Sequence, residues 1–173
     1  AVMLAQKVSV TDVPVLLTGE TGTGKEVFAQ AIHYNSKRSK QSFVAVNCSS
    51  FSKELLESEM FGHKAGSFTG ALKDKKGLFE EANNGTIFLD EIGEFDKNII
   101  DTLRLPLEKK KISLVRKGET YLYPADFMLV AASNPCKCGY YGDAAHQCVC
   151  SPHEITRYQA KLTGPIIDRI DMH

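Results

Sequence analysis

Apolar residues along the chain fall into short runs separated by polar or glycine-rich stretches, an alternation typical of α/β proteins. Apolar runs predict buried strands at residues 13–18, 43–46, 86–91 and 127–132. Apolar residues at helical spacing predict helices at 1–7, after 26, from 52 onward, at 77–82 and from 96 onward. Pro106 lies late in the last helix and is expected to kink or end it. Two short strands are also expected within 111–123. The buried strands and the helices between them favour a parallel sheet covered by helices on both faces.

The first strand runs into a glycine-rich turn that a helical pattern follows, the context in which a GxxxxGK motif binds nucleotide phosphates. The glycines permit backbone angles closed to other residues, so that backbone N–H groups and the helix N-terminus can face an anion. A lysine adds positive charge for the outer phosphates. The predicted ATP-binding residues are Gly19, Glu20, Thr21, Gly22, Thr23, Gly24, Lys25 and Glu26.

The strict form of this motif ends in Ser or Thr, whose hydroxyl binds Mg²⁺, but Glu26 stands there. The metal must therefore be held mainly from elsewhere. The strand at 86–91 delivers two adjacent carboxylates at its C-terminal end, which in a P-loop protein is the Walker B element. We predict that Asp90 binds Mg²⁺ or its waters and that Glu91 polarises the attacking water.

Residues 61–71 contain three glycines in eleven positions, which fits neither a helix nor a strand. This composition predicts a mobile loop that presents Phe68 and Thr69. The alternative is a structural turn that buries Phe68.

Four stretches together resemble the AAA+ domain of bacterial enhancer-binding proteins, the activators of sigma-54 RNA polymerase: GETGTGKE (19–26), FVAVNC (43–48), ESEMFGHKAGSFTGA (57–71) and GTIFLDEIGE (85–94). The resemblance covers residues 1–95 and implies an AAA+ P-loop NTPase fold. It also implies that Glu26 is normal for the family and that Asn47 holds Glu91 inactive until ligand binding. The family's signature loop, implied to contact sigma-54 and to move with the nucleotide state, is here Gly66, Ser67, Phe68, Thr69, Gly70 and Ala71.

Residues 84–173 resemble a different AAA+ branch, the Mg-chelatase-like family that includes competence-associated helicases. The stretches that carry this resemblance are LRLPLE (103–108), YPADFMLVAASNPCKCGYYGD (123–143) and GPIIDRIDMH (164–173). Asn134 matches the AAA+ sensor I position, which senses the γ-phosphate. Arg169 matches the arginine finger, which reaches the nucleotide of a neighbouring subunit, and Arg157 is a weaker candidate. A natural hybrid, a laboratory chimera and a misassembled reading frame all remain open.

Four cysteines form the pattern C-x-C-x9-C-x-C: Cys136, Cys138, Cys148 and Cys150. Four thiolates close in sequence could hold a tetrahedral Zn²⁺, with His146 and His153 as reserve ligands. Free thiols and disulfides are the alternatives. Cys48, outside the pattern, is expected to be a buried core residue.

The 21 basic residues balance the 21 acidic ones, so net charge gives no indication of nucleic-acid or membrane binding. The basic clusters at 37–40, 73–76 and 109–111 are expected to be solvated faces. No apolar run approaches the ~20 residues of a membrane span, and no signal peptide is visible. We therefore expect a protein of the bacterial cytoplasm, without a membrane partner.

Taken together, the 173 residues predict a single AAA+ nucleotide-binding α/β subdomain with ATP and Mg²⁺ as cofactors. Because the chain stops just after Arg169, the helical lid is expected to be absent and the isolated piece to be a weak or inactive ATPase. The main hypothesis is the ATPase domain of a sigma-54-dependent activator. It would remodel RNA polymerase holoenzyme, assemble into a ring of six subunits, and reach DNA through regions outside this chain. The alternatives are a Mg-chelatase-like motor acting on DNA or a partner protein, and an inactive nucleotide-binding fragment.

Overall fold

A computed structural model describes residues 2–50, 53–66, 72–95, 97–116, 119–162 and 170. Its centre is a four-stranded parallel sheet in the order β1–β8–β5–β2. The strands are β1 (Val15–Thr18), β2 (Phe43–Asn47), β5 (Thr86–Asp90) and β8 (Met128–Ser133). The predicted parallel sheet is confirmed, and all four of its strands were expected from the sequence.

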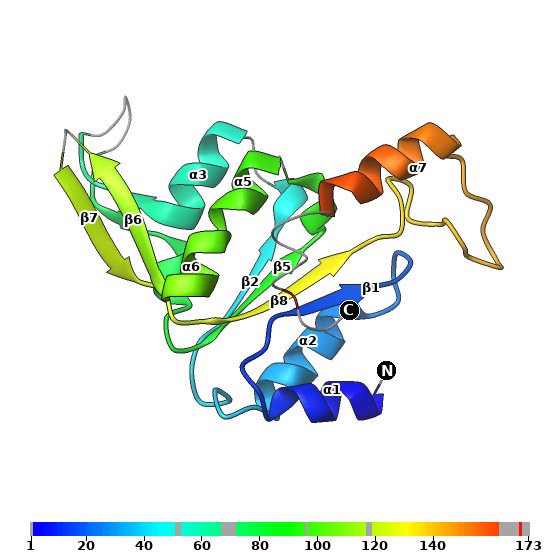
Figure 1. Ribbon diagram of the computed structural model, residues 1–173, viewed down its shortest axis with the longest axis horizontal. Coiled ribbons are helices and arrows are strands. Elements are labelled where there is room, and N and C mark those ends of the chain that lie inside the picture. Colours follow the sequence, from blue (N-terminus) through cyan, green and yellow to red (C-terminus); the bar gives the residue numbers. More distant parts are fainter. Residues whose placement is uncertain are drawn as a thin grey trace.

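Successive strand residues belong to two separate apolar layers, one on each side of the sheet. Helices cover both faces of the sheet (Figure 1). Ile87 and Leu89 belong to the layer beneath α3 (Lys53–Phe61), α4 (Leu78–Glu81), α5 (Lys97–Thr102) and α6 (Arg104–Lys109). Phe88 belongs to the opposite layer, against α1 (Val2–Ser9) and α2 (Lys25–Tyr34). Because both faces are covered, the strands read as continuous apolar runs.

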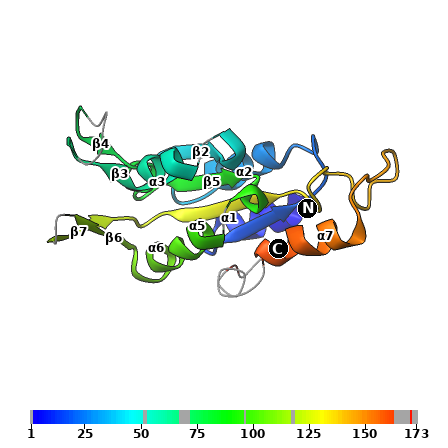
Figure 2. The ribbon, with the colours of Figure 1, turned by 90° about the horizontal axis from the view of Figure 1, so that it is seen from above.

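Two antiparallel ribbons project from the end of the molecule opposite α7 (Pro152–Gln159), as Figure 2 shows. One pairs β3 (Gly62–His63) with β4 (Lys75–Lys76), and the other pairs β6 (Lys111–Arg116) with β7 (Glu119–Pro124). The second ribbon confirms the two strands expected within 111–123. Three short 3-10 helices complete the described elements: η1 (Cys48–Ser50), η2 (Ile92–Glu94) and η3 (Ala160–Leu162).

The helix expected from residue 96 onward is divided in two. α5 ends at Thr102 and α6 begins at Arg104, whereas Pro106 lies inside α6. A proline ring clashes with the carbonyl of the residue four positions earlier, here Thr102. The break therefore falls one turn before the proline.

Arg38 ties together the loops at the amino edge of the sheet. Its side chain is only 11% exposed, so the expectation of a solvated cluster at 37–40 is wrong for this residue. Arg38 Nε donates to Asp12 Oδ1 at 2.8 Å, and Arg38 Nη2 donates to Asp126 Oδ1 at 2.9 Å. Arg38 Nη1 also donates to the Asp126 carbonyl at 2.8 Å. Segments that precede β1 and β8 are thereby joined to the one that precedes β2.

Replacing Arg38 with methionine is expected to lower the free energy of unfolding by roughly 1–3 kcal/mol, because two partly exposed carboxylates and a carbonyl each lose one donor. Urea denaturation at pH 7 measures this change. Arg104→Met is the matched control, since Arg104 is 56% exposed in its pair with Glu108. A control loss as large as that of Arg38→Met would contradict this account.

The effect of Arg38→Met should also depend on pH. The hydrogen bond from Arg38 holds the pKa of Asp12 below its ordinary value. An acid with a lowered pKa in the folded state stabilises the protein above its unfolded pKa, about 3.9, and that contribution is lost as pH falls. The difference in stability between parent and variant should therefore shrink below about pH 4. A difference that stays constant down to pH 2 would contradict the role given to the carboxylates.

Candidate nucleotide-binding site

The segments predicted to bind nucleotide meet at the carboxyl edge of the sheet. β1 leads into the turn at 19–24, β8 into Asn134, and β5 ends in Asp90 with Glu91 next. These three strands are neighbours in the sheet, and β2, which pairs Asn47 with Asp90, follows at the edge. All four strands end on the side of α7 and the loop before it (right in Figure 1). This edge thus brings Lys25 into contact with Asn134, which lies 109 positions later in the sequence.

The turn at 19–24 depends on left-handed backbone at Gly22 (φ 81°) and at Gly24 (φ 79°). A residue with a Cβ rarely adopts these angles, so these two positions need glycine. Gly24 directly precedes α2, and the Thr23 hydroxyl donates to the Glu20 carbonyl at 2.8 Å. The turn therefore carries the chain from the end of β1 to the N-terminus of α2, where unpaired N–H groups favour an anion.

The ammonium of Lys25 lies across this turn. Lys25 Nζ donates to the carbonyls of Gly19 at 2.9 Å and Glu20 at 2.8 Å, and to Asn134 Oδ1 at 2.8 Å. Burial lowers the pKa of Lys25, while the carboxylates of Asp90, Glu20 and Glu91 oppose that shift. The lysine is therefore connected electrostatically to the end of β5 and by a hydrogen bond to the end of β8.

Asp90 and Glu91 sit at a sharp change in backbone direction. Glu91 has a left-handed backbone (φ 54°, ψ 40°), uncommon for a residue other than glycine, and its N–H donates to Asp90 Oδ1 at 2.9 Å. Backbone strain of this kind costs on the order of 1–3 kcal/mol and gathers at functional sites. The two half-buried carboxylates stand where β5 gives way to η2.

Asn47 contacts a serine in this structure. Its Oδ1 accepts hydrogen bonds from the Ser49 backbone N–H at 2.9 Å and from the Ser49 hydroxyl at 2.6 Å. Its backbone is the register partner of Asp90, which brings it to the neighbourhood implied by the enhancer-binding resemblance. The pairing of Asn47 with Glu91 stays a prediction.

Two residues that were not predicted from the sequence, Tyr158 and Lys161, pack on the segment that follows β5. Lys161 Nζ donates to the Gly93 carbonyl at 2.8 Å, and a Cβ added at Gly93 would overlap the Tyr158 ring. Burial raises the pKa of Tyr158 to about 12. α7 itself was not predicted, although Ser151 and Glu154 form a capping box, a pattern readable as S-x-x-E.

Arg169 and residues 67–71 lie outside the described residues, as do Ser52 and Asp96, where two helices were expected to begin. Gly66, the first residue of the expected loop, is described and has a left-handed backbone (φ 77°). Before it, the Ala65 N–H donates to Asp74 Oδ1 at 2.8 Å, and Lys64 pairs with the same carboxylate. These contacts close the base of the loop beside the β3–β4 ribbon.

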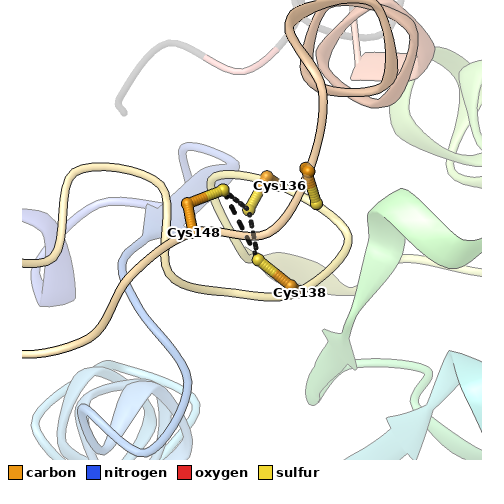
Figure 3. Close-up of side chains that lie close together, drawn as sticks. Cys136, Cys138 and Cys148 are labelled. Carbon is orange, nitrogen blue, oxygen red and sulfur yellow. Dashed lines mark hydrogen bonds between the residues drawn. The ribbon is translucent and has the colours of Figure 1, made fainter.

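The four cysteines predicted as metal ligands come together, and three of them are labelled in Figure 3. The three labelled sulfurs are separated by 3.4 Å (Cys136–Cys138), 3.5 Å (Cys138–Cys148) and 3.7 Å (Cys136–Cys148). Cys150 belongs to the same group, whose ligand atoms all lie within 4.8 Å of one another. Hydrogen bonds from the backbone N–H groups of Tyr140 and Val149 lower the pKa of Cys138 to about 6.

The other candidates for that cluster lie elsewhere. His146 Nδ1 is paired with Asp143 Oδ2 at 2.8 Å, and His153 is exposed on α7. Neither joins the group of candidate ligands found among the described residues. Cys48 is 4% exposed and lies in the apolar core, as expected.

Comparisons with known proteins identify a family for this chain. The family model described as "Sigma-54 interaction domain" matches residues 1–137. The chain is similar to the sigma54-dependent transcriptional regulator SfnR of Pseudomonas fluorescens (strain Pf0-1), with 47% identity over 129 residues. That match covers 75% of this chain and 35% of SfnR, so the chain spans about a third of the relative's length.

Among solved structures, NtrX of Brucella abortus superposes with a TM-score of 0.73 at 23% identity, covering 97% of this chain and 34% of NtrX. The same protein in complex with ADP gives a TM-score of 0.67 at 26% identity, covering 84% of this chain and 31% of NtrX. With the family match, these likenesses show that the fold is the P-loop NTPase core of AAA+ proteins.

The family match also changes the extent of the two resemblances drawn from the sequence. It continues to residue 137, beyond the limit of 95, and so includes β8 and Asn134. None of the matches reported above supports the Mg-chelatase-like resemblance of residues 84–173. Among the described residues, no helix is long and apolar enough to span a bilayer.

Proposed function

Since the chain belongs to the sigma-54 interaction domain family, we propose that it is an ATP-hydrolysing domain that acts on RNA polymerase carrying sigma-54. The observation that carries the proposal is the junction at the carboxyl edge of the sheet. There the Lys25 ammonium spans the glycine-rich turn and hydrogen bonds Asn134, close enough to Asp90 and Glu91 for their charges to influence its pKa. An ADP complex of a structural neighbour at 26% identity adds support for a nucleotide at this edge.

Each residue of the site has a definite part in this proposal. The turn at 19–24 and the N-terminus of α2 hold the phosphates through backbone N–H groups. Lys25 exchanges the Gly19 and Glu20 carbonyls for phosphate oxygens, which are better partners for a cation. Glu91 accepts the proton of the attacking water.

Asp90 fits Mg²⁺, because this ion prefers oxygen ligands and is usually bound through one or two carboxylates together with substrate phosphates. Bound Mg²⁺ would neutralise charge that develops on the phosphates. Glu26, in place of the usual hydroxyl residue, leaves Asp90 as the protein ligand that we assign.

Asn134 connects the nucleotide to the rest of the fold. Its hydrogen bond to Lys25 joins the end of β8 to the turn at 19–24. A γ-phosphate that draws the lysine away would release this amide for its own hydrogen bond to the phosphate. Asn134 would thereby report the nucleotide state to the loop that follows β8, as the sensor assignment requires.

We assign the arginine finger to Arg169, which would complete the site of a neighbouring subunit in a ring of six copies. A finger supplied in trans contributes about 10³–10⁵ in rate, so turnover should depend on assembly. Residues 1–173 would then form one nucleotide-binding subdomain of a longer activator, with DNA contacted by other regions.

Replacing Thr69 with alanine is expected to abolish sigma-54 binding and to leave ATP turnover within about twofold in the assembled protein. The substitution alters the loop at 66–71, whereas the nucleotide residues lie at the carboxyl edge of the sheet. A pull-down with a transition-state nucleotide analogue measures binding, and phosphate release measures turnover. Lys40→Ala, an exposed residue before β2, is the control and should bind sigma-54 normally. Sigma-54 retained by Thr69→Ala, or absent with the parent, would contradict the assignment.

A further inference from the structure

The spacing of the cysteine sulfurs fits one tetrahedral ion. Four sulfurs placed about 2.3 Å from one Zn²⁺ lie about 3.8 Å from one another. The separations among the Cys136, Cys138 and Cys148 sulfurs, 3.4, 3.5 and 3.7 Å, are close to that value and well above a disulfide bond of about 2.05 Å. The Cys150 sulfur lies within 4.8 Å of the other three, and none of the four cysteines forms a disulfide. An iron–sulfur cluster binds its cysteines through different iron atoms, which sets the sulfurs farther apart. The geometry therefore favours a mononuclear site.

The loop supplies the contacts that thiolate ligands need. Cys136 is fully buried, and Cys138 accepts hydrogen bonds from the backbone N–H groups of Tyr140 and Val149. Backbone N–H groups also donate to the other two sulfurs, from Cys150 to Cys148 and from Cys138 to Cys150. Such donors orient sulfur ligands and disperse their negative charge. Four thiolates this close would repel one another without a cation between them.

We propose that the protein binds a single structural Zn²⁺ through Cys136, Cys138, Cys148 and Cys150, and that this ion holds the loop at 135–150 against the nucleotide-binding turn. Soft thiolates select zinc over the hard ions Mg²⁺ and Ca²⁺. Four protein ligands leave no open position on the ion, so its role is structural.

The loop touches the nucleotide-binding turn through Gly139. This glycine is buried in a left-handed backbone (φ 87°), and a Cβ added to it would overlap Thr21 Oγ1. At its start the loop follows Asn134 directly, and the Pro135 carbonyl accepts a hydrogen bond from Gln159 at 3.1 Å. No helix or strand occurs between β8 and α7, and all of that connection lies within the described residues. A loop as long as 135–150 that contains no secondary structure needs some other interaction to fix its conformation, and the bound ion would supply it.

Metal analysis tests the site directly. The purified chain, expressed with added zinc, should contain one zinc per chain, and Co²⁺ exchanged into it should show the absorption of tetrahedral thiolate coordination. Cys148→Ser should retain less than about 0.2 zinc per chain, whereas Cys48→Ala, outside the cluster, should retain one. Parent protein with less than about 0.2 zinc and four freely titrating cluster thiols would overturn the proposal, whether or not the serine variant folds.

Nucleotide affinity tests whether the zinc-bound loop supports the turn at 19–24. This link between loop and turn rests on the proposed ATP site, whereas the metal site does not. Zinc-free protein, with Mg²⁺ restored, should bind a fluorescent ATP analogue at least about fivefold more weakly than the zinc form, and added zinc should reverse the loss. Equal affinity in both forms would overturn the link. Absence of nucleotide binding in both forms would overturn the link and the proposed ATP site, leaving the metal analysis to decide the zinc site.

Two glycines of the loop provide a matched pair for the same measurement. Gly139→Ala should keep its zinc and weaken nucleotide binding, because the new methyl group displaces Thr21. Gly142 has a similar backbone (φ 92°) but nothing within 4 Å of an added Cβ, so Gly142→Ala carries similar strain without the collision. Equal nucleotide affinity in the two variants would contradict the contact.

Discussion

Replacing Glu91 with glutamine is expected to leave ATP binding intact and to lower turnover by about 10²–10⁴-fold, the usual contribution of a general base. The amide keeps the shape of the side chain but accepts no proton from water. The loss corresponds to roughly 3–5 kcal/mol of activation free energy. Phosphate release by the assembled protein measures turnover, and calorimetry measures binding.

Glu94→Gln is the matched control for Glu91→Gln, because Glu94 is an exposed carboxylate three residues further along, in η2. Its turnover should equal that of the parent. Normal turnover in Glu91→Gln would remove Glu91 from the role of base. An equal loss in both variants would point to disturbance of η2 instead.

Replacing Lys25 with alanine is expected to weaken ATP binding by roughly 100-fold or more, since two charge-assisted hydrogen bonds to phosphate are worth about 3–6 kcal/mol. The same change removes the donor that the Gly19 and Glu20 carbonyls and Asn134 share. Thermal unfolding without nucleotide should therefore be recorded beside the binding titration. Lys40→Ala removes an exposed lysine and should bind ATP as the parent does. A folded Lys25→Ala protein with parental affinity would contradict the phosphate site.

Local sequence signals predicted the elements that carry the site. The turn at 19–24 is readable because its glycines, its lysine and its flanking strand and helix are adjacent in sequence. Buried strands such as β5 and β8 are readable because both faces are covered and nearly every position is apolar. The cysteine pattern likewise gave the four sulfurs that the structure brings together.

Contacts between distant segments could not be predicted from a single sequence. Lys25 and Asn134 are 109 residues apart in sequence, and Arg38 and its partner Asp126 are 88 residues apart. Both contacts depend on the position of β8 between β1 and β5, which follows from the whole topology rather than from any local pattern. For the same reason the sequence predicted that Arg38 is exposed like the lysines beside it, whereas the distant Asp126 helps to bury it. Asn47 was placed correctly at the end of β2, but its partner in this structure, Ser49, was not expected.

A structure of the chain crystallised with Mg²⁺ and a non-hydrolysable ATP analogue tests the central claim most directly. We predict phosphates against residues 19–26, Lys25 Nζ about 3 Å from an outer phosphate oxygen, and Mg²⁺ beside Asp90. We also predict that Asn134 Oδ1 no longer holds Lys25 as it does here at 2.8 Å. Nucleotide bound away from the carboxyl edge of the sheet, or no nucleotide at millimolar concentration with the lysine still on Asn134, would contradict the account.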